Sequence, residues 1–168
     1  MSVLAYCGLR VSELVALTVR SIDTNIDLPM LQLRGTKGGK LRAVPLPADT
    51  ATAINTYLAD RAILAGSSPA LALDQRGLLF IRTDGGPLSQ PLIDKLLRRL
   101  CTTASVEMPE GAMAHGLRHF YGSQLAIRGV PLAVIQQLLG HNSPSTTSIY
   151  TRTHSDDLSQ ALSEAGML

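Results

Sequence analysis

The sequence predicts a mainly α-helical chain with one small antiparallel β-sheet, an α+β fold. Apolar residues recur at helical spacing in most segments, one stretch between residues 30 and 46 alternates with a period of two, and glycines and prolines separate these segments. With 168 residues, of which 45% are hydrophobic and 17% charged, the chain can bury one core and is too short for two ordinary domains. We therefore expect residues 1–168 to form a single domain.

The chain begins with two short helices. Its first six residues are apolar and compatible with a helix, which the turn at Cys7-Gly8 ends. A second helix fits Ser12 to Val19, because Leu14 and Leu17 lie there at positions i and i+3.

Residues 30–46 predict a β-hairpin with a basic tip. Leu31 and Leu33 share one face of the first strand, and a turn rich in glycine and lysine separates it from a second alternating run at 41–46. Pro45 and Pro47 end that second strand. A further apolar run at 78–81 is either a third small strand or a buried connection.

The remaining elements are predicted as helices from their boundary residues. Ser89 and Ser155 are suited to N-caps, Gly129 to a helix stop and Pro131 to a first helical position. The expected helices run from Asp49 or Thr50 to Gly66, from Ser89 through Leu100, from Ala114 to Arg128, from Pro131 to Gly140, from Ser143 towards Tyr150, and from Ser155 through Leu162.

Positive charge is segregated along the chain, although the net charge is only +2. No acidic residue lies between Asp27 and Asp49, or between Glu110 and Asp156. These two runs contain the basic residues Arg34, Lys37, Lys40, Arg42, Arg118, Arg128 and Arg152 and the four histidines His115, His119, His141 and His154. If the runs converge, they form an electropositive face that attracts polyanions; if not, the side chains are simply solvated.

Composition argues against several classes of protein. No stretch approaches the roughly 18 apolar residues of a membrane helix, and the first residues lack the pattern of a signal peptide, so we expect a cytoplasmic chain with no membrane contact. Cys7 and Cys101 are too few for a disulfide framework and lack the paired spacing of a zinc site. Asp156-Asp157 is an isolated acidic pair, which argues against a two-metal nuclease.

Several polar residues are spaced for chemistry on a phosphodiester. His115 and Arg118 lie at i and i+3, on one face of a helix start, although such a pair alone is a weak motif. Arg10 enters a helix with Glu13 at i+3, where the carboxylate can hold its guanidinium. Lys37 lies between Thr36 and two glycines at the hairpin tip, where the chain is flexible.

His141 and Tyr150 complete a set of groups suited to phosphoryl transfer without a metal. Five segments that contain this set resemble the signature boxes of tyrosine recombinases, especially bacterial Xer-type enzymes and phage integrases. They read CGLRVSEL at 7–14, TKGGKLRAVPL at 36–46, HGLRH at 115–119, LLGH at 138–141 and IYT at 149–151, in the order of the family. The resemblance runs from about Leu4 to about Leu162.

The resemblance implies a tyrosine recombinase catalytic-domain fold and assigns roles to single residues. Arg10 and Arg118 would clamp the non-bridging oxygens of the scissile phosphate. His115 would assist proton transfer and His141 would hydrogen-bond the phosphate, while Lys37 would protonate the departing 5′ oxygen.

Tyr150 would be the nucleophile, forming a 3′-phosphotyrosine that a 5′-hydroxyl later attacks. Since the ester conserves the energy of the bond, the resemblance implies no metal, ATP or other cofactor. Glu13 is expected as a supporting, buried partner of Arg10, and Lys40, Arg42 and Arg152 as contacts to the DNA backbone. His119 and His154 are expected to be packed or solvated.

The implied partners are double-stranded DNA and further copies of the chain, as a tetramer on synapsed sites in a bacterial nucleoid or on a mobile element. The family usually has an N-terminal core DNA-binding domain, so we expect a catalytic domain truncated at its N-terminus. Leu158 and Leu162 pack either on a neighbouring subunit or on their own core. Two alternatives remain: a non-catalytic regulator, because residues 132–151 have helix-turn-helix spacing, and a type IB topoisomerase-like nicking-closing enzyme.

Overall fold

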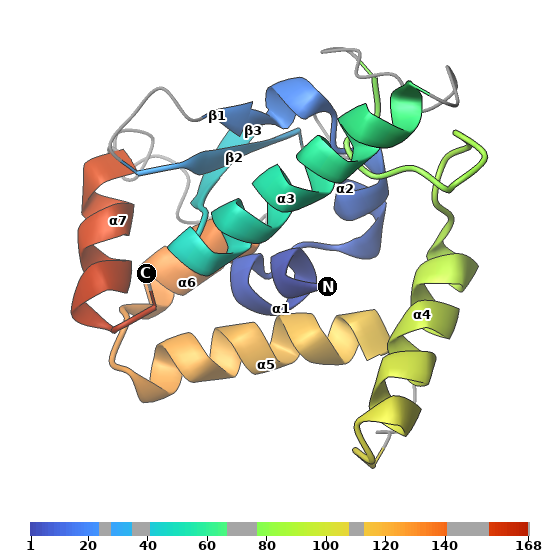
Figure 1. Cartoon of the computed structure of the whole chain (residues 1–168). Helices are drawn as coiled ribbons and strands as arrows, with labels where there is room; N and C mark the ends of the chain where they lie inside the picture. The colour runs from blue at the N-terminus through green and yellow to red at the C-terminus, as the bar shows by residue number, and fades with distance from the viewer. Residues whose placement is uncertain (24–27, 35–40, 67–76, 108–112, 141–154, 168) are drawn as a thin grey trace.

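The computed structural model describes residues 1–23, 28–34, 41–66, 77–107, 113–140 and 155–167, with only the backbone of 155–159. Figure 1 shows helices surrounding one small sheet, which confirms the predicted fold class. The elements in chain order are α1 (Ser2–Cys7), α2 (Val11–Ala16), the 3-10 helix η1 (Val19–Ser21), β1 (Ile22–Asp23), β2 (Met30–Arg34), β3 (Leu41–Pro45), α3 (Ala48–Ala65), α4 (Gln90–Thr103), α5 (Met113–Ile127), α6 (Leu132–Leu139) and α7 (Ser155–Glu164).

The sheet has three antiparallel strands in the order β1-β2-β3. The register of β2 and β3 runs from Met30 opposite Pro45 to Arg34 opposite Leu41, so the predicted hairpin is confirmed. The third strand of this sheet is β1, which the sequence did not predict, because two residues are too short to show alternation.

The apolar run at 78–81 is a buried connection and not a strand of this sheet. Leu79 is fully buried, Leu78 forms an isolated bridge with Thr18, and Ile81 forms another with Pro87. Arg61 of α3 donates hydrogen bonds to the carbonyls of Leu78 and Leu79 at 2.7 and 3.0 Å, which ties the connection to that helix.

The helices lie close to the predicted ranges, with one clear correction. The helix expected at Ser12–Val19 ends at Ala16, because Leu17 turns into an extended conformation and Thr18 pairs with Leu78. The side chain of Ser89 caps α4 as predicted, accepting a hydrogen bond from the Leu92 amide at 3.4 Å. The helix expected from Ser143 lies outside the described residues.

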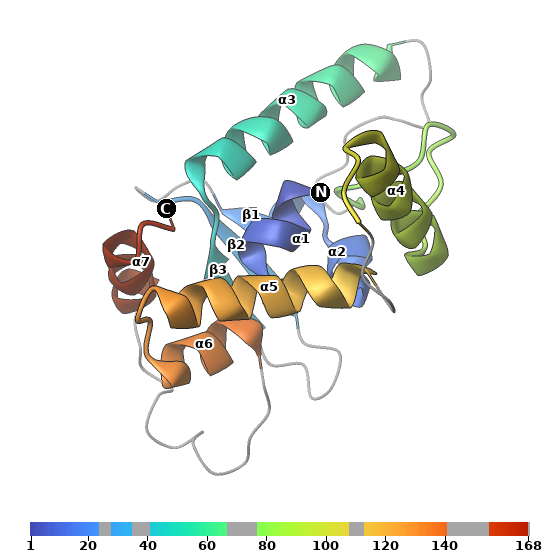
Figure 2. The same ribbon diagram turned by 90° about the horizontal axis from the view of Figure 1, so that it is seen from below.

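The core lies between the sheet and the long helix α5. Figure 2 shows α1 between α5 and the sheet, with α4 near one end of α5 and α6 beside the other. Leu4, Leu9, Leu125 and Leu138 are fully buried there. Leu162 of α7 is also buried. Of the two alternatives expected for this leucine, it packs on the core of its own chain and not on a neighbouring subunit. None of the described helices combines the length and apolar character needed to cross a membrane.

Candidate active site

Gly8 allows the turn that positions Arg10. It ends α1 with a φ of 60°, and a Cβ atom there would lie 2.4 Å from Cδ1 of Tyr121 on α5, so only glycine fits. The buried Leu9 then anchors the connection. Arg10 is the N-cap residue of α2, and its backbone amide donates to Oε2 of Glu13 at 2.8 Å. A glutamate three residues into a helix commonly makes this contact, which explains the spacing of the two residues.

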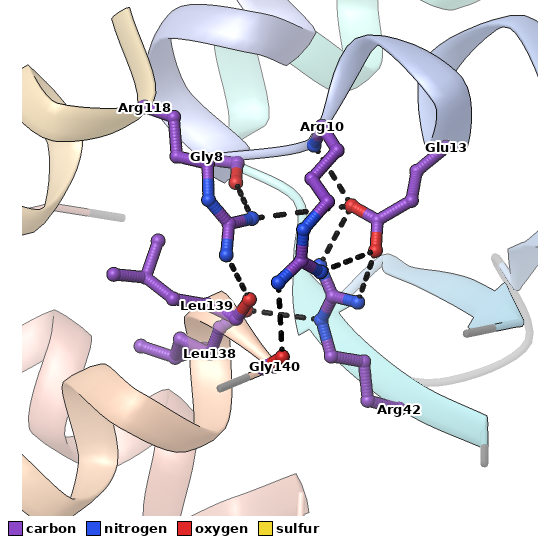
Figure 3. Close-up of polar contacts among 8 residues, drawn as sticks. All are labelled: Gly8, Arg10, Glu13, Arg42, Arg118, Leu138, Leu139 and Gly140. Carbon is purple, nitrogen blue, oxygen red and sulfur yellow. Dashed lines mark hydrogen bonds and ion pairs between the residues drawn. The ribbon is translucent and has the colours of Figure 1, made fainter. Parts of the chain in front are cut away.

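The carboxylate of Glu13 lies at the centre of a cluster of three arginines (Figure 3). Arg42 of β3 forms a bidentate ion pair with it, with Nη1–Oε1 at 2.6 Å and Nη2–Oε2 at 3.0 Å. Nη1 of Arg10 is 3.2 Å from Oε1, and Nη1 of Arg118 is 4.0 Å from Oε2. The side chain of Glu13 is only 2% exposed, so this carboxylate is shielded from water. We call these four residues the arginine cluster.

The same three arginines hold the C-terminal end of α6. Arg42 donates from Nε to the Leu138 carbonyl at 3.0 Å, Arg118 from Nη2 to the Leu139 carbonyl, and Arg10 from Nη2 to the Gly140 carbonyl at 3.2 Å. Carbonyl groups at a helix C-terminus carry the negative end of the helix dipole, so cations are favourable there. These contacts join α2, β3, α5 and α6 at one point, as Figure 3 shows.

The two arginines expected to bind phosphate differ in exposure. The side chain of Arg10 is 41% exposed, whereas that of Arg118 is 7% exposed and donates from Nη1 to the Gly8 carbonyl at 2.7 Å. Burial, and then the charge of Arg10, lower the pKa of Arg118 to about 10, with Glu13 acting in the opposite direction. Arg118 therefore stays charged at neutral pH.

Glu13 is also charged at neutral pH. Burial alone would raise the pKa of its carboxyl group, but the hydrogen bonds and charges of Arg42 and Arg10 together bring the pKa below its usual value. Three guanidinium groups around one carboxylate thus leave positive charge in excess. A site of this kind attracts an anion whose negative charge lies on oxygen atoms.

His115 lies on the same helix as Arg118, one turn nearer its start, and is exposed. Its Nε2 atom is 2.9 Å from Nε2 of His119, and the rings meet edge to face. The sequence did not predict this contact, although the spacing of i and i+4 was a signal for it. Tyr121, by contrast, is fully buried and burial raises its pKa, which makes it unsuited to be a nucleophile.

The structure thus brings together three of the predicted site residues, Arg10, Glu13 and Arg118. It adds Arg42, which was expected to contact DNA and here contacts Glu13 and α6. A signal for this was available, because Arg42 lies two residues before the apolar Val44 and therefore on the same face of β3, the face that is buried at Val44.

Five predicted site residues lie outside the described residues: Lys37, Lys40, His141, Tyr150 and Arg152. Within the part of the chain that is described, no three His, Cys, Asp or Glu side chains gather to hold a metal ion.

Comparisons with known proteins find similarity to tyrosine recombinases in sequence and in fold. The sequence profile of the phage integrase family matches residues 1–157. Tyrosine recombinase XerA of Pyrococcus furiosus is 36% identical over 161 residues, covering 96% of this chain and 51% of XerA. Tyrosine recombinase XerD of Xanthomonas axonopodis pv. citri is 39% identical over 145 residues, covering 86% of this chain and 46% of XerD.

The fold of a solved recombinase is also similar. The crystal structure of the XerH site-specific recombinase bound to its difH substrate, a pre-cleavage complex, matches with a TM-score of 0.70 and 28% identity, covering 96% of this chain and 44% of XerH. The chain spans about half the length of the XerA and XerD sequences that it matches.

Proposed function

Since the chain belongs to the phage integrase family, we propose that it is the catalytic domain of a site-specific tyrosine recombinase. It cleaves and rejoins strands of double-stranded DNA through a 3′-phosphotyrosine. The observation that carries this proposal is the arginine cluster, in which Arg10 and Arg118 both lie within 4.0 Å of one buried carboxylate. The alternative function, a helix-turn-helix regulator without catalysis, does not explain this cluster.

The charge balance of the cluster suits a phosphoryl-transfer transition state. Negative charge builds on the phosphate oxygens during such a reaction, and guanidinium groups fixed in advance stabilise it at little cost in reorganisation. Glu13 fixes the arginines without neutralising all three of them. Arg10, the most exposed of the three, is the first to meet a phosphate, and the buried Arg118 adds charge from behind it.

The proposed reaction uses groups from both the described and the remaining residues. The oxygen of Tyr150 attacks the phosphorus, and the 5′ oxygen leaves with a proton from Lys37. His115 assists proton transfer and His141 hydrogen-bonds the phosphate. In the second step a 5′-hydroxyl attacks the phosphotyrosine, which restores the phosphodiester and the free tyrosine.

The sequence positions of these groups support the assignment. His141 directly follows Gly140, whose carbonyl accepts a hydrogen bond from Arg10. Lys37 belongs to the connection between β2 and β3, and β3 carries Arg42 into the cluster. His115 is one helical turn from Arg118.

Arg42 is assigned to positioning. Its Nε, Nη1 and Nη2 atoms all donate to groups of the protein, and its side chain is 12% exposed, so a phosphate contact would compete with Glu13 and α6. Lys40 and Arg152 are the proposed contacts to the DNA backbone. Because strand exchange needs two cleaved duplexes, we also propose that several copies of the chain act together on DNA.

A nicked suicide substrate tests the proposal. In such a duplex the short fragment beyond the cleavage site diffuses away, so a covalent protein–DNA adduct accumulates and is seen on a denaturing gel. We expect an adduct from the parent chain and from the control Tyr6→Phe, whose tyrosine is exposed on α1. Tyr150→Phe should give none. An adduct that persists in Tyr150→Phe contradicts the assignment of Tyr150 as the nucleophile. If the parent chain forms no adduct with any duplex in a panel of recombination sites, the proposed cleavage activity is contradicted.

A further inference from the structure

We propose that His115 and His119 form a binding site for a divalent transition-metal ion, with Ni²⁺ and Cu²⁺ preferred. The two residues lie one turn apart on α5, so their side chains leave the same face of the helix. Their Nε2 atoms are 2.9 Å apart, and both residues are exposed. An ion can therefore reach both nitrogens from solvent.

The distance between the two nitrogens is already close to that of a chelate. Metal–imidazole bonds are about 2.0–2.1 Å long, so two of them at a right angle place the nitrogens about 2.9 Å apart. A tetrahedral angle, as in zinc sites, would require about 3.3–3.4 Å. The separation of 2.9 Å in this structure matches the right angle. Right-angled positions are those of square-planar and tetragonal Cu²⁺ and Ni²⁺ sites.

The protonation of the pair also favours an ion. A hydrogen bond between two imidazole nitrogens needs one donor and one acceptor, so at least one ring carries a lone pair directed at the other. When a metal ion binds, the ring that carries Nε2–H releases this proton to water and takes one up at Nδ1, so that the Nε2 lone pairs of both neutral rings bind the ion. Because both side chains are exposed, small ring rotations can direct both lone pairs at one ion.

The described residues supply two ligands and no third one. Among them no other His, Cys, Asp or Glu joins the pair. The nearby guanidinium of Arg118 is buried and donates to the Gly8 and Leu139 carbonyls, so its hydrogen bonds are directed to those carbonyls and not to the pair. The described residues thus form a two-imidazole chelate.

One consequence rests on the proposed function. An ion on Nε2 of His115 occupies the lone pair that proton transfer needs, so a bound ion inhibits strand cleavage. Binding itself does not depend on that function, which allows the two proposals to fail separately.

Calorimetric titration of the tag-free chain with NiCl₂ tests the site. Ni²⁺ is preferable to Cu²⁺ because it does not oxidise the thiols of Cys7 and Cys101. The first variant is His119→Gln. The matched control is the double variant His119→Gln/Ser123→His, which keeps the number of histidines but moves the second one to an exposed position about 12 Å from His115 along α5.

We expect the parent to bind one Ni²⁺ and both variants to bind it about a hundredfold more weakly, because the second ligand of a chelate acts at high effective concentration. Six-coordinate, tetragonal Ni²⁺ is paramagnetic, so in NMR spectra it should broaden the imidazole signals of His115 and His119 first. Parent-like affinity in either variant overturns the site, as does a parent that binds no ion. Circular dichroism checks that the variants keep the fold.

Discussion

Replacing Glu13 by glutamine should destabilise the protein more than almost any other change of one polar atom. Glutamine keeps the shape and one acceptor of the side chain but removes the negative charge. Three guanidinium groups would then face each other without a carboxylate, two of them on largely buried side chains. The contacts that join α2, β3 and α5 through Glu13 would weaken together.

The expected loss follows from the burial of each pair. Glu13 is 2% exposed and Arg42 is 12% exposed, so they form a buried ion pair, and removal of one partner from such a pair costs about 3–5 kcal/mol. Arg10 is 41% exposed, so its contact adds less than about 1 kcal/mol. For a chain of this size each kcal/mol lowers Tm by about 2–4 °C, which gives a decrease of roughly 6–20 °C.

Urea unfolding followed by circular dichroism measures this loss, with Asp84→Asn as the matched control. Asp84 pairs with Arg82 at the surface, where the side chains are 54% and 51% exposed, so this control should lose far less stability than Glu13→Gln. The double variant Glu13→Gln/Arg42→Gln should lose less than the sum of its single variants, because each single variant leaves a buried group unpaired. A loss in Glu13→Gln no larger than that in Asp84→Asn would refute the reasoning.

Three further predictions follow from the same contacts. The folded-state pKa of Glu13 lies below its usual value, so its contribution to stability is present above the usual glutamate pKa and is lost as pH falls through the folded value. Glu13→Gln should lack this part of the pH dependence. If the free energy of unfolding changes with pH in the same way in the parent and in Glu13→Gln, the prediction is contradicted. Gly8→Ala should destabilise more than Gly129→Ala. Both glycines have positive φ, but a Cβ atom added at Gly8 would overlap the ring of Tyr121, whereas the space at Gly129 is open; equal losses in urea unfolding would argue against this. DNA binding by the chain alone should be weak and fall steeply with salt in a gel-shift titration, and tight binding that salt does not affect would be inconsistent with phosphate contacts by a few basic side chains.

Local signals predicted most of the fold. The hairpin of β2 and β3 was predictable because its alternation and its glycine-rich turn both occur within one short stretch. The start of α4 was predictable from Ser89, whose side chain caps it. The end of α2 was not, because the residue that stops it, Thr18, pairs with Leu78, 60 residues away.

The apolar residues of α3 are not all buried. Ile54 is buried, whereas Ile63 and Leu64 are 75% and 54% exposed. The sequence predicts the helix, but the length over which it packs depends on how far the neighbouring elements extend.

The same distinction between local and distant contacts applies to the site. Arg10 and Glu13 were paired from their spacing of three residues, and the structure shows that pair. The partner of Arg42 is 29 residues away, and Arg10 contacts a carbonyl 130 residues away, so no local pattern could predict these bonds. The side of β3 on which Arg42 lies was the one sequence feature that pointed to a buried partner.

The most direct test of the central claim is to locate the DNA on the protein. After reaction with the nicked substrate and removal of most of the DNA by nuclease, trypsin separates the four tyrosines into different peptides, and Tyr150 is the one tyrosine of peptide 129–152. Mass spectrometry should find the added nucleotide on that peptide, at Tyr150. A nucleotide on a peptide with Tyr6, Tyr57 or Tyr121 would contradict the account.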